Sequence, residues 1–238
     1  IGNKVMKIQI LDCTLRDGGY YTNWDFNKVL VDKYLAYMNK LPIDYIEVGY
    51  RSNQNSGYGG EYYYLPSSTI KHISKNTEKK IAVMINAKDN ISPDVLLDLV
   101  SSVSLIRITS SPDQLSENIK LAQEIKNLGF EVAMNVMYIS KIDDDHSFYK
   151  NISNIEEVLS YLYLVDSYGS IYPNELDRFI KKVRSKTSVK LGFHGHNNIE
   201  LAFSNSLTAI DNGVEIIDST VLGMGRGAGN LKTELILN

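Results

Sequence analysis

Cysteine is almost absent from this sequence, with Cys13 the only one among 238 residues. A single cysteine excludes an internal disulfide and any zinc site built from several cysteines, and it favours the reducing environment of the cytoplasm. No apolar run approaches the roughly 20 residues that span a bilayer, and the first ten residues lack the apolar core of a secretory signal. Acidic residues outnumber basic ones by only 28 to 25, so charge gives no reason to expect a nucleic acid or a membrane as partner.

Apolar residues are present in sufficient number for one sizeable core. They make up 43% of the chain, slightly below the usual share in globular proteins. The length is close to the roughly 250 residues of a typical single α/β barrel. No linker, low-complexity tract or change of composition divides the sequence. We therefore expect one catalytic domain over residues 1–238.

Short β-branched segments alternate along the chain with longer amphipathic segments. Predicted strands cover residues 7–16, 45–50, 80–86, 105–110, 130–137, 162–166, 189–196 and 215–222. Predicted helices cover residues 27–39, 92–101, 111–128, 154–160, 172–185 and 199–212. Strands separated by helices indicate parallel βαβ units, and eight strands is the number that closes a (β/α)8, or TIM, barrel. An open doubly wound sheet is the alternative, but it usually has a glycine-rich turn after its first strand.

The eighth βα unit looks truncated in its last helix. The sequence ends at Asn238, about where that helix should begin. Without cover, the first and eighth strands would present an apolar flank to water. We expect either that a second copy or a partner enzyme covers this flank, or that the chain is the N-terminal part of a longer polypeptide, and we favour the second.

Two histidines lie two residues apart at the end of the seventh predicted strand. Residues at this spacing in a strand point to the same face, so His194 and His196 would both enter the barrel. Two converging imidazoles can hold a divalent metal. An ordinary pair of polar residues at a strand end is the competing interpretation.

An arginine and an aspartate end the first predicted strand. Asp17 could supply a carboxylate ligand, and the rigid donor fork of Arg16 could hold a carboxylate or a developing enolate. A structural ion pair at the barrel rim explains the same residues.

A glycine-rich segment, residues 223–230, follows the eighth predicted strand. Glycines allow backbone amides to approach a ligand closely, and the loops after strands seven and eight bind phosphate in many barrels. Asn230 at its end could instead turn its amide oxygen toward a metal. The segment alone does not distinguish phosphate binding by its backbone amides from metal binding by Asn230.

Taken together, these motifs resemble a known family. The segments LDCTLRDGG (residues 11–19), IEVGY (46–50), LVDSYG (164–169) and the long stretch 192–230 are similar to the DRE-TIM metallolyases. This superfamily includes hydroxymethylglutaryl-CoA lyase, the isopropylmalate, homocitrate and citramalate synthases, and 4-hydroxy-2-oxovalerate aldolase. The aldolase branch is the most similar.

The resemblance implies a divalent metal, Mn²⁺ or Mg²⁺, and a 2-oxo acid substrate. The implied metal ligands are Asp17, His194, His196 and, as a further ligand, Asn230. By the same resemblance Arg16 neutralises the enolate oxygen of pyruvate. The residues expected beside the metal or the substrate are Asp166, Ser167 and Glu47, the last of which would orient Arg16 or a metal-bound water, or form a rim ion pair.

One position departs from the aldolase pattern. The loop after the first strand supplies a histidine base in those enzymes, and Tyr20 stands at the matching position. A phenol is a weak base near neutral pH. Tyr20 could act as an acid or an orienting donor, a metal-bound hydroxide could be the base, or His146 could fold over the site from the loop after the fifth strand. Lys88, after the third strand, keeps a Schiff-base mechanism open.

Three functions are therefore considered. The first is a metal-dependent aldolase that cleaves or forms a carbon–carbon bond through a pyruvate enolate, for example between a 4-hydroxy-2-oxo acid and pyruvate plus an aldehyde. The second is a Claisen-type enzyme that condenses or cleaves acyl-CoA thioesters, which would need elements for CoA binding. The third is a catalytically silent barrel that serves as a binding subunit.

Overall fold

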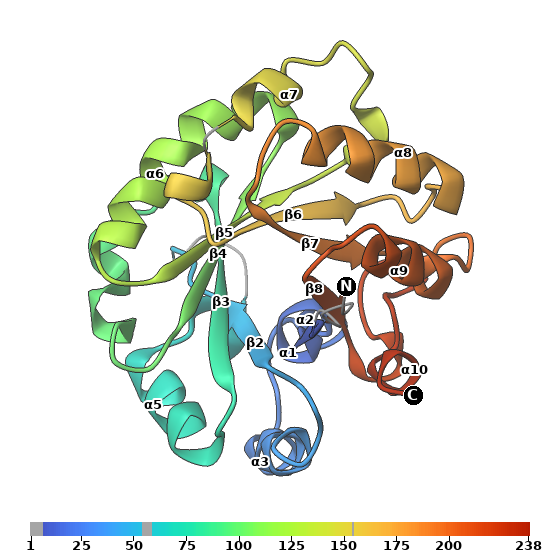
Figure 1. Cartoon of the computed structure of the whole chain (residues 1–238). Helices are drawn as coiled ribbons and strands as arrows, with labels where there is room; N and C mark the ends of the chain where they lie inside the picture. The colour runs from blue at the N-terminus through green and yellow to red at the C-terminus, as the bar shows by residue number, and fades with distance from the viewer. Residues whose placement is uncertain (1–6, 54–58, 154) are drawn as a thin grey trace.

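The chain forms a closed barrel of eight parallel strands in the order β1 to β8, as predicted (Figure 1). The computed structural model describes residues 7–53, 59–153 and 155–238. The strands are β1 Gln9–Asp12, β2 Tyr45–Tyr50, β3 Lys80–Asn86, β4 Leu105–Ser110, β5 Glu131–Val136, β6 Tyr161–Asp166, β7 Lys190–Gly195 and β8 Ile216–Ser219. β1 pairs with β8 over the register Gln9↔Ile216 to Asp12↔Ser219, which closes the barrel. This is the (β/α)8 fold.

Helices surround the strands on the outside (Figure 1). The α-helices are α1 Thr14–Asp17, α2 Gly19–Thr22, α3 Lys28–Met38, α4 Glu61–Tyr64, α5 Ser67–Asn76, α6 Leu115–Asn127, α7 Phe148–Asn151, α8 Pro173–Arg184, α9 Ala202–Asp211 and α10 Thr233–Ile236. The 3₁₀ helices are η1 Ala87–Asp89, η2 Pro93–Leu99, η3 Pro112–Gln114, η4 Ile139–Lys141, η5 Ile155–Glu157 and η6 Val221–Gly223. α10, in the eighth unit, is a single turn.

Local sequence signals explain where several helices begin. Asn27 starts α3 because its side chain accepts hydrogen bonds from the amides of Val29 and Leu30. Pro173 opens α8 at a position where its missing N–H costs nothing, and the Glu175 carboxylate accepts a hydrogen bond of 2.9 Å from the Tyr172 amide. Within the described residues, no helix has the length and apolar character needed to cross a membrane.

Two of the predicted helices differ from the structure, and one helix of the structure was not predicted. The helix predicted over residues 92–101 is present as the shorter 3₁₀ helix η2, Pro93–Leu99. The helix predicted over 154–160 starts at a residue outside the described part, and the rest holds only the short η5. The sequence analysis set no bounds for α5, whose residues Thr69, Ile70 and Ile73 are buried.

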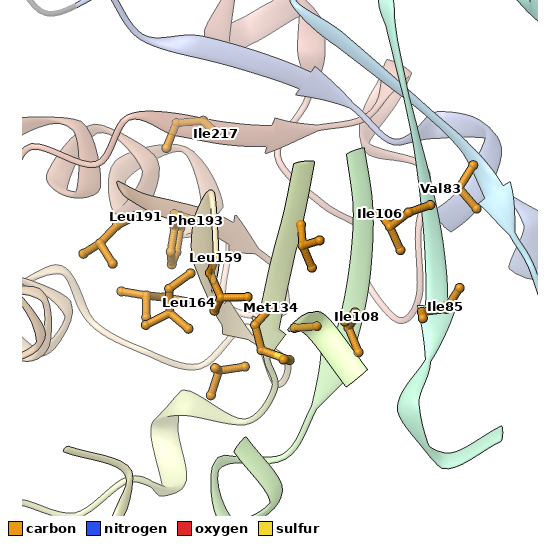
Figure 2. Close-up of a cluster of buried hydrophobic side chains, with 14 of the residues drawn as sticks. Val83, Ile85, Ile106, Ile108, Met134, Leu159, Leu164, Leu191, Phe193 and Ile217 are labelled. Carbon is orange, nitrogen blue, oxygen red and sulfur yellow. The ribbon is translucent and has the colours of Figure 1, made fainter. Parts of the chain in front are cut away.

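Strand alternation sorts the side chains into an outer core and a lumen. The outward residues of the strands pack under the helices, as Figure 2 shows for Val83, Ile85, Ile106, Ile108, Met134, Leu164, Leu191, Phe193 and Ile217. The inward residues form a second cluster that includes Leu11, Tyr45, Leu105, Tyr163 and Ile216. Successive strand residues face opposite sides, so the lumen also receives the polar residues that lie between the outward ones.

Candidate metal centre and active site

Four charged or polar side chains enter the lumen from four different strands. Glu47 lies between the outward residues Ile46 and Val48 of β2, and Arg107 lies between Ile106 and Ile108 of β4. By the same alternation, His194 of β7 follows Phe193, and Asp218 of β8 follows Ile217. His194 and Asp218 lie toward the carboxyl ends of their strands, the face on which barrel enzymes carry their active sites, and Glu47 and Arg107 lie deeper, in the middle of theirs.

Arg16 and Asp17 reach the same face from a helical turn and not from a strand. The prediction that β1 runs to residue 16 was wrong, because the strand ends at Asp12. The Asp12 carboxylate accepts a hydrogen bond of 2.9 Å from the amide of Thr14, and the Asp17 amide bonds to the Cys13 carbonyl at 2.9 Å. A polar side chain that captures a nearby amide redirects the backbone out of the strand. The turn is buried, and Asp17 has no exposed surface.

Asp17, His194 and His196 form a possible metal-binding group. Their ligand atoms all lie within 4.8 Å of one another, and His194 Nε2 is 3.6 Å from Asp17 Oδ2. Burial, followed by the nearby His194, lowers the pKa of His196 to about 3, so this imidazole is in the neutral form that a metal requires. One carboxylate and two imidazoles suit Mn²⁺ and other first-row ions. The residues present therefore fit a divalent cation.

Asp218 fixes the orientation of His194. Its carboxylate oxygen Oδ2 lies 2.8 Å from His194 Nδ1, and a carboxylate can only accept, so Nδ1 carries the proton. The lone pair of Nε2 is then free on the Asp17 side, as in other metal-binding histidines whose second nitrogen is held by a carboxylate. Cys13, His194 and Asp218 form an alternative group, but burial raises the pKa of the Cys13 thiol well above its ordinary value, which disfavours a thiolate ligand.

A buried chain of alternating positive and negative side chains contacts the candidate ligands. Arg16 donates from Nη1 to Asp17 at 2.6 Å and from Nε to Glu47 at 2.7 Å. Arg107 lies 3.0 Å from Glu47 and 2.5 Å from Asp218. Although burial opposes ionisation, the adjacent Arg16 guanidinium holds the pKa of Asp17 below its ordinary value. The two arginines and three carboxylates carry a net charge of −1, which a divalent cation would offset.

Asn230 is placed beside the candidate ligands by the glycine-rich segment. Its backbone bridges to His196, and its Nδ2 donates to an Asp17 oxygen and to the Met224 carbonyl. Its Oδ1 is buried and accepts no hydrogen bond from the part of the chain that the structure describes. Gly229 has φ +86°, and a Cβ there would overlap the Gly223 carbonyl. The glycines allow the loop to pack tightly around Asn230.

A cavity of about 180 Å³ opens next to this group. It lies at the mouth of the barrel, and its walls include Arg16, Tyr20, Lys88, His194, His196 and Arg226. Arg16 Nη2 makes no hydrogen bond within the described residues, so this donor is available to a ligand. The volume is below the roughly 300–1,000 Å³ of sites for drug-sized ligands. A small acid fits this description.

Among the predicted site residues that do not line this cavity, three make their contacts with nearby loops. Asp166 accepts hydrogen bonds from the amides of Ser170 and Ile171 at 3.2 Å each, and Ser167 Oγ accepts one from the Tyr138 amide at 2.9 Å. Both therefore hold the loop after β6 in place. His146 does not fold over the site, since its Nε2 lies 3.3 Å from Asp113 and its Nδ1 accepts from a backbone amide.

Arg107 and Asp218 were missed by the sequence analysis. The signal for each was a charged residue at an inward position of an apolar strand. Arg107 stands between two isoleucines and has no exposed surface, with its guanidinium 4.0 Å from the Tyr163 ring centroid. A fully buried charge needs a partner, so a second charge had to lie in the lumen.

The chain is similar to known proteins over nearly its whole length. The sequence model of the HMGL-like family matches residues 7–238. The 4-hydroxy-2-oxovalerate aldolase of Carboxydothermus hydrogenoformans is 28% identical, over 97% of this chain and 70% of that protein. The oxaloacetate decarboxylase of Mycobacterium tuberculosis is 25% identical, over 96% of this chain and 68% of that protein.

Solved structures show the same barrel. The N-terminal domain of a candidate aldolase from Bacteroides vulgatus superposes with a TM-score of 0.93 at 49% identity, covering 97% of this chain and 78% of that one. The HMG-CoA lyase of Bacillus subtilis superposes with a TM-score of 0.69 at 15% identity, covering 97% of this chain and 84% of that one. At such low identity the second likeness concerns the fold alone.

Proposed function

We propose that this chain, which belongs to the HMGL-like family, is a divalent-metal-dependent carbon–carbon lyase that acts through the enolate of pyruvate. The observation that carries the proposal is the convergence of Asp17, His194 and His196 within 4.8 Å beside the cavity that Arg16 lines. A cation and a guanidinium at one point can stabilise the negative charge that develops on an enolate oxygen.

The two differently named relatives support the same intermediate. Cleavage of 4-hydroxy-2-oxovalerate releases an aldehyde from C3 of a 2-oxo acid, and decarboxylation of oxaloacetate releases carbon dioxide from C3. In both reactions the electron pair of the broken bond remains on pyruvate as its enolate. One enolate site could therefore serve either reaction, and the departing fragment distinguishes the two.

The residues have separate tasks in this reaction. Asp17, His194 and His196, with Asn230 as a further ligand, would hold the ion, and Mn²⁺ suits two imidazoles better than Mg²⁺ does. The ion, when bound, supplies Lewis-acid polarisation of the substrate ketone. Arg16 directs its free Nη2 to the same oxygen, while Glu47 and Asp17 fix the guanidinium in place. Asp218 keeps the Nε2 lone pair of His194 directed toward Asp17.

Tyr20 is the residue that we assign to proton transfer at the substrate hydroxyl. It lines the cavity and packs edge-on against Trp24 with ring centroids 4.7 Å apart. The guanidinium of Arg226 lies 5.5 Å from its ring centroid. Among the described residues that line the cavity there is no carboxylate and no histidine apart from His194 and His196. Tyr50, Tyr138 and Lys88 line the cavity as well, and Tyr20 is preferred because it stands at the position where the aldolases that the chain resembles carry their histidine base.

Exchange of the pyruvate methyl protons tests the proposed function without knowledge of the departing fragment. In D₂O, Mn²⁺-loaded protein should replace these protons with deuterium, as followed by NMR, and protein treated with a chelator should not. Restoring Mn²⁺ to the treated protein should restore the exchange. Equal, background-level exchange in loaded and stripped protein would favour a silent barrel.

Replacing Tyr20 with phenylalanine should lower kcat for aldol cleavage by about 10²-fold, the usual contribution of a positioned acid–base group. Steady-state assays of pyruvate release would measure it. Tyr21→Phe is the matched control, because Tyr21 is the next residue, is 63% exposed and does not line the cavity. Equal activity of the two variants would leave a metal-bound hydroxide as the base.

A further inference from the structure

A lysine stands across the cavity from the candidate metal ligands. Lys88 belongs to η1, directly after β3, and lines the cavity. His194 and His196 come from the end of β7. In the closed order β1 to β8, strands β3 and β7 are diametrically opposite. A substrate whose 2-oxo acid end lies at the histidines therefore extends its other end toward the wall that carries Lys88.

This wall is polar and offers a cation without a partner. Lys88 makes no ion pair within residues 7–53, 59–153 and 155–238. The same side of the cavity is lined by hydrogen-bonding side chains from the ends of β3 and β4 and the loop after β4, namely Asn86, Thr109, Ser111 and Gln114. None of the described cavity residues is acidic. The wall is thus suited to an anion.

Charge at the metal side is already compensated without Lys88. The buried chain of two arginines and three carboxylates carries −1. A divalent cation and the carboxylate of a 2-oxo acid bring this sum to zero. Arg226, which also lines the cavity, adds a further positive charge. Neither the candidate metal ligands nor the first carboxylate therefore requires the charge of Lys88, which is available to a second negative group of the substrate.

We propose that the fragment released by this enzyme is an aldehyde that carries an anionic group, a carboxylate or a phosphate, and that Lys88 binds this group. The proposal rests on the proposed lyase function. In the reaction the C3–C4 bond breaks, its electron pair forms the pyruvate enolate, and the C4 hydroxyl gives its proton to the acid–base group as it becomes the aldehyde carbonyl. One proton returns to C3 of the enolate to give pyruvate, so no proton is gained or lost overall. The anionic group takes no part and keeps its charge throughout.

Lys88 would favour decarboxylation less than it favours aldol cleavage of a substrate with a remote anionic group. A carboxylate that leaves as carbon dioxide loses its charge in the transition state. A lysine that binds it would therefore stabilise the substrate more than the transition state and slow the reaction. An anionic group further along the chain is stabilised equally in both states, so Lys88 would improve binding without this cost.

Aldol condensation with matched aldehydes tests the proposal. Mn²⁺-loaded protein and pyruvate would be combined with succinic semialdehyde or its neutral methyl ester, and with glyceraldehyde 3-phosphate or glyceraldehyde. We expect kcat/KM to be higher for at least one anionic member of a pair by about tenfold or more, the usual effect of one charged hydrogen bond. The two pairs distinguish a carboxylate from a phosphate.

Lys88→Met should remove this preference, and Lys88→Arg should keep most of it. Lys120→Met is the control, because Lys120 is an exposed lysine on α6 and should leave the preference unchanged. Pyruvate methyl exchange in the same samples separates the two proposals. Exchange without a preference for an anionic aldehyde, or a preference that survives Lys88→Met, overturns the role of Lys88 alone. Absence of exchange overturns the lyase function itself.

Borohydride trapping gives an independent check on Lys88. A Schiff base between pyruvate and this lysine would be reduced to a stable adduct, which peptide mass spectrometry would locate. We expect no adduct, because Lys88 binds a charged group and forms no covalent bond. An adduct on Lys88 would contradict the anion-binding role.

Discussion

Arg107→Met should lower the free energy of unfolding by about 3–5 kcal/mol, the cost of breaking a buried ion pair. Arg107 has no exposed surface and is the only described residue that contacts both Glu47 and Asp218 through ion pairs. Its removal leaves Asp218 with only the hydrogen bond to His194 Nδ1, and leaves Glu47 with Arg16 alone. Urea unfolding of the metal-free proteins would measure the change.

A surface ion pair supplies the matched control for Arg107. Lys181 pairs with Asp177 one turn away on α8, and its side chain is 67% exposed. Lys181→Met should change the free energy of unfolding by less than about 0.5 kcal/mol. If Arg107→Met were as mild as Lys181→Met, the buried chain of charges would not be the support of the metal site that we infer.

Arg16→Gln should lower kcat/KM for pyruvate release by about 10²–10³-fold, as the loss of one preorganised donor to an oxyanion does. The interaction strengthens as the enolate forms, so most of the loss should fall on kcat. Arg16→Lys should recover only part of the activity, because an ammonium cannot bond Glu47, Asp17 and the substrate with the fixed geometry of a guanidinium.

Two further measurements separate this catalytic role of Arg16 from a structural one. The pyruvate methyl exchange of Arg16→Gln should fall in parallel with turnover, although no aldehyde is present. Arg178→Gln, at an exposed arginine on α8, should leave both rates unchanged. An Arg16→Gln variant that is folded, retains its metal and exchanges pyruvate protons at the normal rate would contradict the assignment.

Strand periodicity made the barrel and half of the site predictable. The segments around β2, β3, β4 and β5 were placed within a residue or two, because their outward residues form continuous apolar stripes. The spacing of His194 and His196 sufficed to put both on one face. The same reasoning failed at β1, where Asp12 binds the Thr14 amide and turns the backbone into α1. A side chain that bonds locally is not visible in a hydrophobic pattern.

The remaining features depend on contacts between distant parts of the chain. Asp218 acts on His194 across 24 positions, and Arg107 acts on Asp218 across 111. One sequence indicates that a buried arginine needs a partner but not which carboxylate provides it. The separation of His146 from the cavity likewise follows from its contact with Asp113, which no local pattern specifies. Which side chains pair in the lumen depends on which strands the closed barrel brings together.

Metal content tests the central claim most directly. The sequence contains four histidines, so His194→Ala/His196→Ala can be compared with His72→Ala/His146→Ala, which removes the other two. Elemental mass spectrometry of proteins purified without chelator and dialysed against Mn²⁺ should find about one divalent ion per chain in the wild type and in the His72/His146 variant, and almost none in the His194/His196 variant. Equal metal content in the two double variants, or none in the wild type, would contradict the metal centre and the enolate chemistry built on it.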